Sequence, residues 1–200
     1  MDRKEMIRDV STMTCKEIFG EILSKQIHAL MFHDQMASYF DFLGLNGFKR
    51  MHEYQYLSES VTYRKVQRYF INRYNEIVES HDVENPQAIP SEWLKHTRGE
   101  VTPSIKKRSV KEAFEDYKEW EKSVEECFSV YAQSLYDRGM LMDYSFVLDL
   151  IKDVCKEVKR IDRLMLKLGG VEYDLTYIEE MQDCLHEKYK KKTHHVGSEL

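Results

Sequence analysis

Apolar residues recur at intervals of three and four in four long stretches of the chain, which is the spacing of an amphipathic helix. The pattern predicts helices over about residues 14–43, 48–79, 109–138 and 142–168, followed by a shorter helix over about 175–191. Strict alternation of apolar and polar residues, the pattern of a half-buried strand, never persists. We therefore expect an all-α fold.

The breaks between these stretches predict how the helices are connected. Glycines at Gly44 and Gly139 end the first and third stretches, and Gly169 ends the fourth. Short turns then join the first helix to the second and the third to the fourth, so each pair is expected to be antiparallel.

A long connection separates the two pairs. All three prolines of the chain, Pro86, Pro90 and Pro103, fall within about residues 80–109, where we expect no long helix beyond one turn at residues 91–94. Ser109 is the expected N-cap of the third helix, because Glu112 follows it at the spacing of a capping box. With a polar tail at about residues 193–200, the chain reads as one helical domain over residues 1–200.

Composition excludes several classes of protein. The formal charge of −5, from 30 basic and 35 acidic side chains, gives no reason to expect a nucleic-acid partner. No apolar run of about 18 residues occurs that would span a membrane, and the charged N-terminus is unlike a secretory signal. The four cysteines lie far apart and are expected to be free thiols in a reducing cytoplasm: Cys15, Cys127, Cys155 and Cys184.

Three carboxylates interrupt the apolar stripes of the predicted helices. Asp34 lies on the stripe of the first helix, Glu59 on that of the second, and Glu121 on that of the third, where Tyr117 and Val124 share its face. A buried carboxylate is costly unless it has a partner. Each of the three is therefore either a ligand for a cation, the partner of a Lys or Arg, or a residue at the edge of its stripe.

The segments around these carboxylates resemble the ferritin family. The residues from Asp34 to Tyr39 are similar to the family's Glu-x-x-Ala-Ser-Tyr, and those from Glu119 to Val124 to its Leu-Glu-Lys-Ser-Val, while Glu59 matches its bridging Glu. The resemblance implies a ferritin-like four-helix bundle with a long crossover between helices two and three and a short fifth helix. It also implies iron bound at Asp34, Glu59 and Glu121, oxidation of iron by oxygen, iron storage, and assembly of a homo-oligomer of two or more chains.

One departure from the family pattern bears on the iron site. A di-iron centre of this type needs Glu-x-x-His on the second helix, but Thr62 stands three residues after Glu59, and no Glu-x-x-His occurs in the chain. The three carboxylates supply ligands for one ion. A second ion would need ligands from a wider set, namely His33, His52, Glu53, Tyr63, Asp153, Cys155 or Glu157.

Two alternatives therefore stand beside the iron-binding hypothesis. One is a metal-free ferritin-like bundle that acts as a structural or protein-interaction module, which the missing histidine favours. The other is a di-metal oxidase or reductase that acts on an organic substrate, which would require an open pocket beside the metals.

Overall fold

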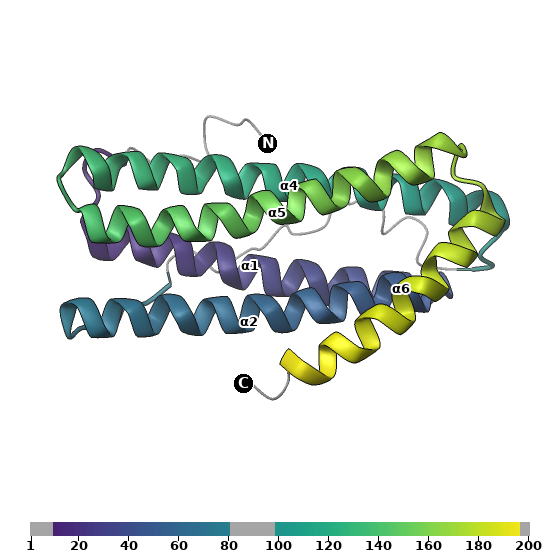
Figure 1. The fold of residues 1–200 in the computed structure, drawn as a ribbon, viewed down its shortest axis with the longest axis horizontal. Helices are drawn as coiled ribbons and strands as arrows, with labels where there is room; N and C mark the ends of the chain where they lie inside the picture. Colours follow the sequence, from purple (N-terminus) through teal and green to yellow (C-terminus); the bar gives the residue numbers. More distant parts are fainter. Residues whose placement is uncertain (1–9, 81–98, 197–200) are drawn as a thin grey trace.

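The structure is a computed structural model that describes residues 10–80 and 99–196, with side chains described up to residue 192. These residues form helices α1 (Cys15–Phe42), α2 (Asn46–Tyr74), α4 (Pro103–Asp137), α5 (Leu141–Gly170) and α6 (Leu175–Val196), and they contain no strand. The four long helices α1, α2, α4 and α5 lie side by side, and α6 turns back across the bundle to lie against α2 (Figure 1). The prediction of an all-α bundle with a short last helix is confirmed.

The N-termini of α1 and α4 are set by side-chain caps. Thr14 and Glu17 form a reciprocal capping box at the start of α1, with Glu17 Oε2 accepting from the Thr14 backbone N–H at 2.6 Å. Helix α4 begins at Pro103, with Thr102 as its N-cap, so the expected start at Ser109 is wrong. Proline at the first helical position lacks only a donor that would have had no partner, so it starts a helix as readily as it breaks one.

Ser109 has a different role from the one its spacing predicted. It is buried within α4, and its hydroxyl oxygen accepts a 2.8 Å hydrogen bond from the Tyr39 hydroxyl group of α1. Helix α2 also ends earlier than expected, at Tyr74, because Asn75 adopts the left-handed conformation with φ of 53°. The expected helical turn at residues 91–94 lies outside the described residues.

The hairpin turns follow the sequence expectation. Gly44 and Gly139 both have φ of +71°, a conformation that favours glycine, and they lie in the α1–α2 and α4–α5 turns. No described helix is both long enough and apolar enough to cross a bilayer. All four cysteines are free.

The apolar core of the bundle is divided into two clusters along its length. Near the α6 end, the first cluster is built around aromatic rings of α1, α2 and α4, including Phe40, Phe48 and Phe114. The second cluster fills the opposite half and includes Phe19 and Phe128. Between the two, each long helix contributes polar residues, which we call the polar layer: His33, His52, Gln55, Glu59, Glu121, Glu157 and Arg160.

Candidate metal centre

The inner face of α1 is centred one residue away from the position that the sequence pattern predicted. His33 is completely buried, whereas its neighbour Asp34 is exposed. Consecutive residues of a helix differ in direction by about 100°, and the buried series of α1 continues through Ala29, Met36 and Phe40. The expectation that Asp34 faces the bundle interior is therefore wrong, and His33 takes the inward position.

His33 is paired with the other buried histidine. Its Nδ1 atom lies 3.0 Å from Nδ1 of His52 on α2, and both side chains are 0% exposed. Burial lowers the pKa of His33 to about 3 and that of His52 well below its ordinary value, with the positive charge of Arg160 acting in the same direction. Both rings are therefore neutral, and in each tautomer one Nδ1 donates while the other accepts.

The outer nitrogens of this pair are the unusual feature. The Nε2 atoms of His33 and His52 are buried and have no hydrogen-bond partner among the described residues. His33 Nε2 lies 4.0 Å from Glu121 Oε1, too far for a hydrogen bond, and since the imidazole is neutral the contact is not an ion pair. A buried nitrogen without a partner costs free energy unless a ligand or a moved side chain satisfies it.

Glu121 and Glu59 bring two carboxyl groups to the same layer. Glu121 on α4 is 6% exposed, and burial raises its pKa well above the ordinary value, an effect to which the charge of Glu59 adds. Burial likewise raises the pKa of the partly buried Glu59 to about 7, with repulsion from Asp153 as the second cause. Both groups therefore hold protons more tightly than an exposed carboxyl group does.

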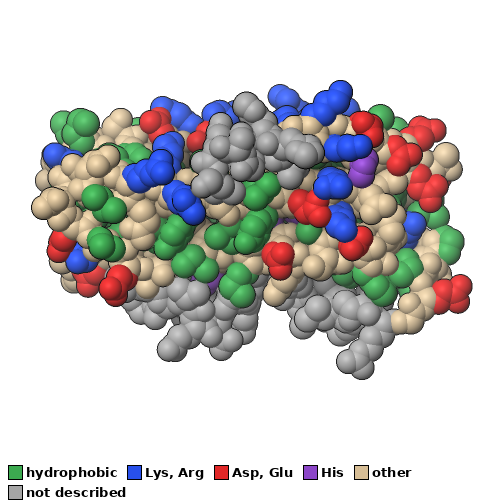
Figure 2. All heavy atoms as spheres, turned by 90° about the horizontal axis from the view of Figure 1, so that it is seen from below, with side chains coloured by type: hydrophobic (Ala, Val, Ile, Leu, Met, Phe, Trp, Pro, Cys, Tyr) green, Lys and Arg blue, Asp and Glu red, His purple; other side chains and the backbone are tan. Residues whose placement is uncertain are grey.

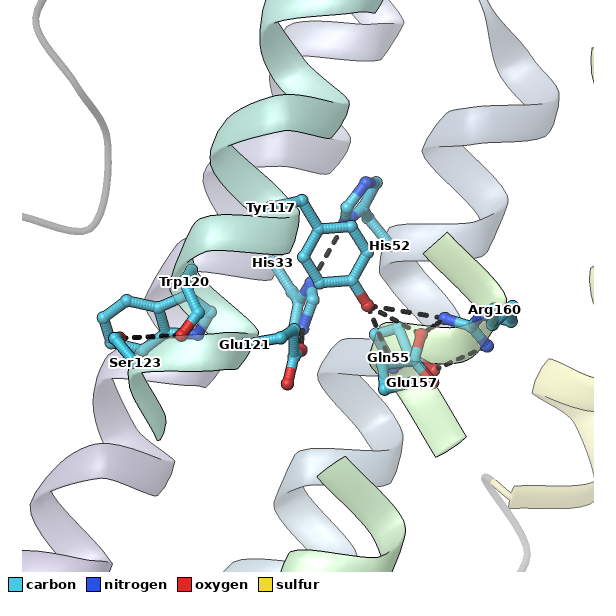
Figure 3. Close-up of polar contacts among 9 residues, drawn as sticks. All are labelled: His33, His52, Gln55, Tyr117, Trp120, Glu121, Ser123, Glu157 and Arg160. Atoms are coloured by element: carbon cyan, nitrogen blue, oxygen red, sulfur yellow. Dashed lines mark hydrogen bonds and ion pairs between the residues drawn. The ribbon is translucent and has the colours of Figure 1, made fainter. Parts of the chain in front are cut away.

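Arg160 of α5 supplies the one strong positive charge in the layer. Its guanidinium donates to Gln55 Oε1 at 3.3 Å and to the Tyr117 hydroxyl oxygen at 3.4 Å, and it forms an ion pair with Glu157 (Figure 3). The Tyr117 hydroxyl group in turn donates to Glu157 at 2.8 Å. The charge of Arg160 partly offsets the cost of ionising the buried Glu121 and the partly buried Glu59.

The sequence pattern did not identify Arg160. One signal was available, because Glu157 lies three residues after Val154 and four before Ile161, on the apolar stripe of α5. A carboxylate at such a position requires a partner, and Arg160 lies one helical turn further along.

Most of the additional ligands considered from the sequence have partners elsewhere. Glu53 binds Arg50 at 3.2 Å and Asp153 binds Lys156 at 2.7 Å, while Cys155 donates to Glu125 at 3.3 Å. Glu157 is held by Arg160 and Tyr117, and the Tyr63 hydroxyl oxygen accepts from Gln67 at 3.5 Å. Of the wider set, His33, His52 and Glu157 lie in the polar layer, and Glu157 is already paired there with Arg160.

Across residues 10–80 and 99–192, no three His, Cys, Asp or Glu side chains are placed together closely enough to hold a metal ion as they stand. The polar layer thus contains suitable ligand types, and a bound ion would require Glu59 and Glu121 to turn toward His33.

Comparison with known proteins identifies the architecture. An open-pore ferritin from the hyperthermophilic archaeon Archaeoglobus fulgidus matches with a TM-score of 0.69 at 19% identity, over 88% of this chain and 98% of that chain. A closed form of A. fulgidus ferritin, engineered by site-directed mutagenesis, gives the same TM-score and identity over 90% of this chain and 96% of its own. The fold is that of the ferritins. No family model and no curated protein matches the chain.

Within this ferritin-like bundle, the ligand set implied by the resemblance is only partly kept. Glu59 and Glu121 both lie in the polar layer, but Asp34 lies outside it. Thr62, which stands where the ferritin pattern has histidine, turns its hydroxyl group back to the Ser58 carbonyl oxygen at 3.1 Å. Imidazoles are nevertheless present, supplied by His33 and His52 from different positions.

Proposed function

We propose that this ferritin-like bundle binds one divalent transition-metal ion, with iron as the physiological metal, through His33, Glu59 and Glu121. The observation that carries the proposal is the buried His33 Nε2 atom, which has no hydrogen-bond partner among the described residues and lies 4.0 Å from Glu121 Oε1. Imidazole nitrogen together with carboxylate oxygen suits ferrous iron and its neighbours in the first transition series. Iron is proposed because the two solved structures that the chain resembles are ferritins.

The electrostatics of the polar layer support cation binding. Two carboxyl groups with raised pKa values and two neutral imidazoles are what remains when a cation is removed from a buried ligand set. A divalent ion would cancel the charge of both carboxylates once their protons leave. His52 would then accept the Nδ1 hydrogen of His33 and hold Nε2 toward the ion, which is the usual role of a second residue behind a histidine ligand.

The same layer favours one ion over two. Arg160 already places a fixed positive charge near both carboxyl groups, and a second dication would have to bind against it. Glu157, the remaining acidic residue of the layer, is neutralised by that guanidinium. A single bound iron would supply one-electron oxidation and reduction at this centre.

Assembly and location are part of the same proposal. We propose that the chain is a single ferritin-like domain that forms a homo-oligomer in the cytoplasm. The likeness to two ferritins supports assembly, and the four free thiols are typical of a reducing compartment.

The proposal is tested by adding ferrous iron anaerobically to metal-free protein and measuring bound ions and subunit number by native mass spectrometry. We expect one iron per chain, and a distinct visible spectrum when Co²⁺ replaces it. Glu121→Gln and His33→Leu should each weaken binding at least about tenfold, the loss of one ligand being worth more than about 1.4 kcal/mol. Asp34→Asn is the matched control and should bind as the unmodified chain does.

Two results would contradict metal binding by these residues. One is the absence of any stoichiometric ion at near-neutral pH. The other is an Asp34→Asn variant that loses binding as completely as Glu121→Gln. Binding should also weaken as the pH falls below about 7, because protons compete for Glu59 and Glu121.

One observation favours a second candidate function. The guanidinium of Arg160 contacts Gln55, Tyr117 and Glu157. Its positive charge also acts on the carboxyl groups of Glu59 and Glu121, so the protein itself supplies a cation to the layer. In that case the bundle is metal-free and serves as a structural or interaction module. Arg160→Gln separates the two: it should raise metal affinity if an ion competes with the guanidinium, and should only destabilise the fold if no ion binds.

A further inference from the structure

A second polar site lies on the outer surface of the bundle, between α2 and α5. Its cavity has a volume of about 320 Å³, at the lower end of the usual range for small-molecule sites. The cavity is lined by one aliphatic side chain, three basic ones and two aromatic ones: Val61, Arg64, Lys65, Arg68, Tyr69 and Phe146. None of these residues belongs to the polar layer, so the cavity is separate from the candidate metal centre.

The three basic residues form a positive cluster on a protein whose overall charge is negative. The chain carries a formal charge of −5, yet the part of α2 beyond Glu59 contains Arg64, Lys65, Arg68 and Arg73 and no acidic residue. Figure 2 shows the molecule from the α2 side, with basic side chains beside exposed apolar ones on its left-hand part and a further group of basic side chains on its right-hand part. Such clustering creates a local positive potential that attracts anions.

Acidic residues of α5 have partners of their own, including Asp143, which accepts from the cavity-lining Tyr69 at 3.0 Å. Asp149 of α5 accepts from Lys152 at 2.8 Å, and Asp153 accepts from Lys156 at 2.7 Å, each within its own helix. No carboxylate of the described residues forms an ion pair with Arg64, Lys65 or Arg68. The hydrogen-bonded Lys152 lowers the pKa of the Asp149 carboxyl group most, and Lys65 lies near enough to lower it further but forms no ion pair with it, so all three basic side chains can turn to an external anion.

An aromatic pair forms the floor of the cavity. The rings of Tyr69 and Phe146 are stacked with centroids 3.8 Å apart, and both belong to the second apolar cluster through contacts with Phe19. The Nζ atom of Lys65 lies over the Phe146 ring, 5.8 Å from its centroid. The floor is fixed by packing, whereas the basic side chains above it are exposed and free to close on a ligand.

We propose that this cavity binds a small anion that carries two or more phosphoryl groups, held by Arg64, Lys65 and Arg68. Arginine forms bidentate hydrogen bonds with phosphate oxygens, and lysine adds a point charge. Arg64 and Arg68 are separated by one helical turn, so adjacent phosphoryl groups are within reach of both. The apolar floor is left for the organic part of the ligand. The proposal does not depend on metal binding at the polar layer.

The test uses metal-free full-length protein, so that its result is independent of the metal centre. Isothermal titration calorimetry at about 0.15 M salt, where long-range attraction between exposed charges is screened, compares pyrophosphate, ADP and adenosine. We expect pyrophosphate and ADP to bind and adenosine to show no binding. If ADP binds more tightly than pyrophosphate, the aromatic floor contacts the nucleoside.

Matched variants assign the binding to this cavity. Arg64→Gln and Arg68→Gln should each weaken pyrophosphate binding about tenfold or more, whereas Arg163→Gln, an exposed arginine elsewhere on α5, should leave it unchanged. All three arginines are exposed, so each variant should keep the fold, and circular dichroism checks that it does. The proposal is overturned if neither phosphate ligand binds at about 1 mM, if Arg163→Gln has an equal effect, or if only an oligonucleotide binds.

Discussion

The Nδ1 atoms of His33 and His52 lie 3.0 Å apart in two rings that are fully shielded from solvent. The pair joins α1 to α2 beside the first apolar cluster, with Phe40 stacked against His52 at a centroid distance of 5.4 Å. Because burial depresses both pKa values, the contact is a bond between neutral imidazoles, and it is lost when both rings are protonated, since each Nδ1 then carries a hydrogen. The stability of the bundle is therefore tied to pH through these two residues.

Acid should destabilise the metal-free protein through this histidine pair. The unfolded histidines titrate near pH 6.5, whereas the folded pKa of His33 is about 3, so stability is present above pH 6.5 and is lost as the pH falls toward 3. Each histidine contributes at most about 1.4 kcal/mol per pH unit in that window. Urea unfolding between pH 7 and 5 measures the slope, and the double variant His33→Phe/His52→Leu should make it shallower. An unchanged slope would contradict the assignment.

Glu59 should make the stability of the protein depend on pH with the opposite sign. Its folded pKa of about 7 lies above the unfolded value of 4.5, so its contribution is fully present below pH 4.5 and is lost as the pH rises through 7. Between those limits the free energy of unfolding of Glu59→Gln should therefore rise above that of the unmodified chain by about 1–3 kcal/mol. Chemical unfolding at pH 4.5 and pH 7.5 gives the difference, with exposed Asp34→Asn as the control that should show none of it. Saturating metal should reverse the sign, because the ion binds deprotonated carboxylates.

The architecture was predictable because it depends on features that repeat along the chain. The glycines at 44 and 139 and the apolar spacing of three and four residues place both helical hairpins. Helix ends were harder, since each depends on one local competition. Ser109 had the residues of a capping box, but Thr102 and Pro103 start α4 earlier, and Ser109 is then used within the helix.

The centre was predictable only in part, because it depends on which of two adjacent residues faces inward. A shift of one residue on α1 exchanged Asp34 for His33, and the apolar periodicity of a long helix does not resolve such a shift. Glu121 was the more secure prediction, since apolar residues surround it on its stripe. The role of Arg160 could be found only from the three-dimensional structure, because its contacts come from α2, α4 and α5 together.

Asp143 should be a strong determinant of stability at the other end of the bundle. This fully buried residue of α5 accepts hydrogen bonds from the Tyr69 hydroxyl group at 3.0 Å and from that of Tyr74 at 2.8 Å, and Arg73 lies 3.9 Å away. Asp143→Ala leaves both hydroxyl groups without their acceptor and should cost about 2–4 kcal/mol. Urea unfolding checks the loss, and Asp149→Asn, at an exposed carboxylate six residues further along α5, should change stability by less than about 0.5 kcal/mol.

Gly47 should control the docking of α6. A β-carbon built at this position would lie 1.7 Å from the Gln182 carbonyl oxygen, and the backbone N–H of Gly47 donates to Gln182 Oε1 at 2.9 Å. Alanine normally stabilises a helix by about 0.5–1 kcal/mol over glycine. Gly47→Ala should instead destabilise the protein, because backbone of α6 has to move away from α2.

The matched control for this prediction is Gly169→Ala. Gly169 also lies within a helix, and nothing stands within 4 Å of the position of its β-carbon, so this variant should be neutral or slightly more stable. Limited proteolysis followed by mass spectrometry distinguishes a displaced α6 from general unfolding. Cleavage within α6 should accelerate in Gly47→Ala while α1, α2, α4 and α5 stay protected, and equal protection of α6 in both variants would show that the bundle absorbs the clash without releasing the helix.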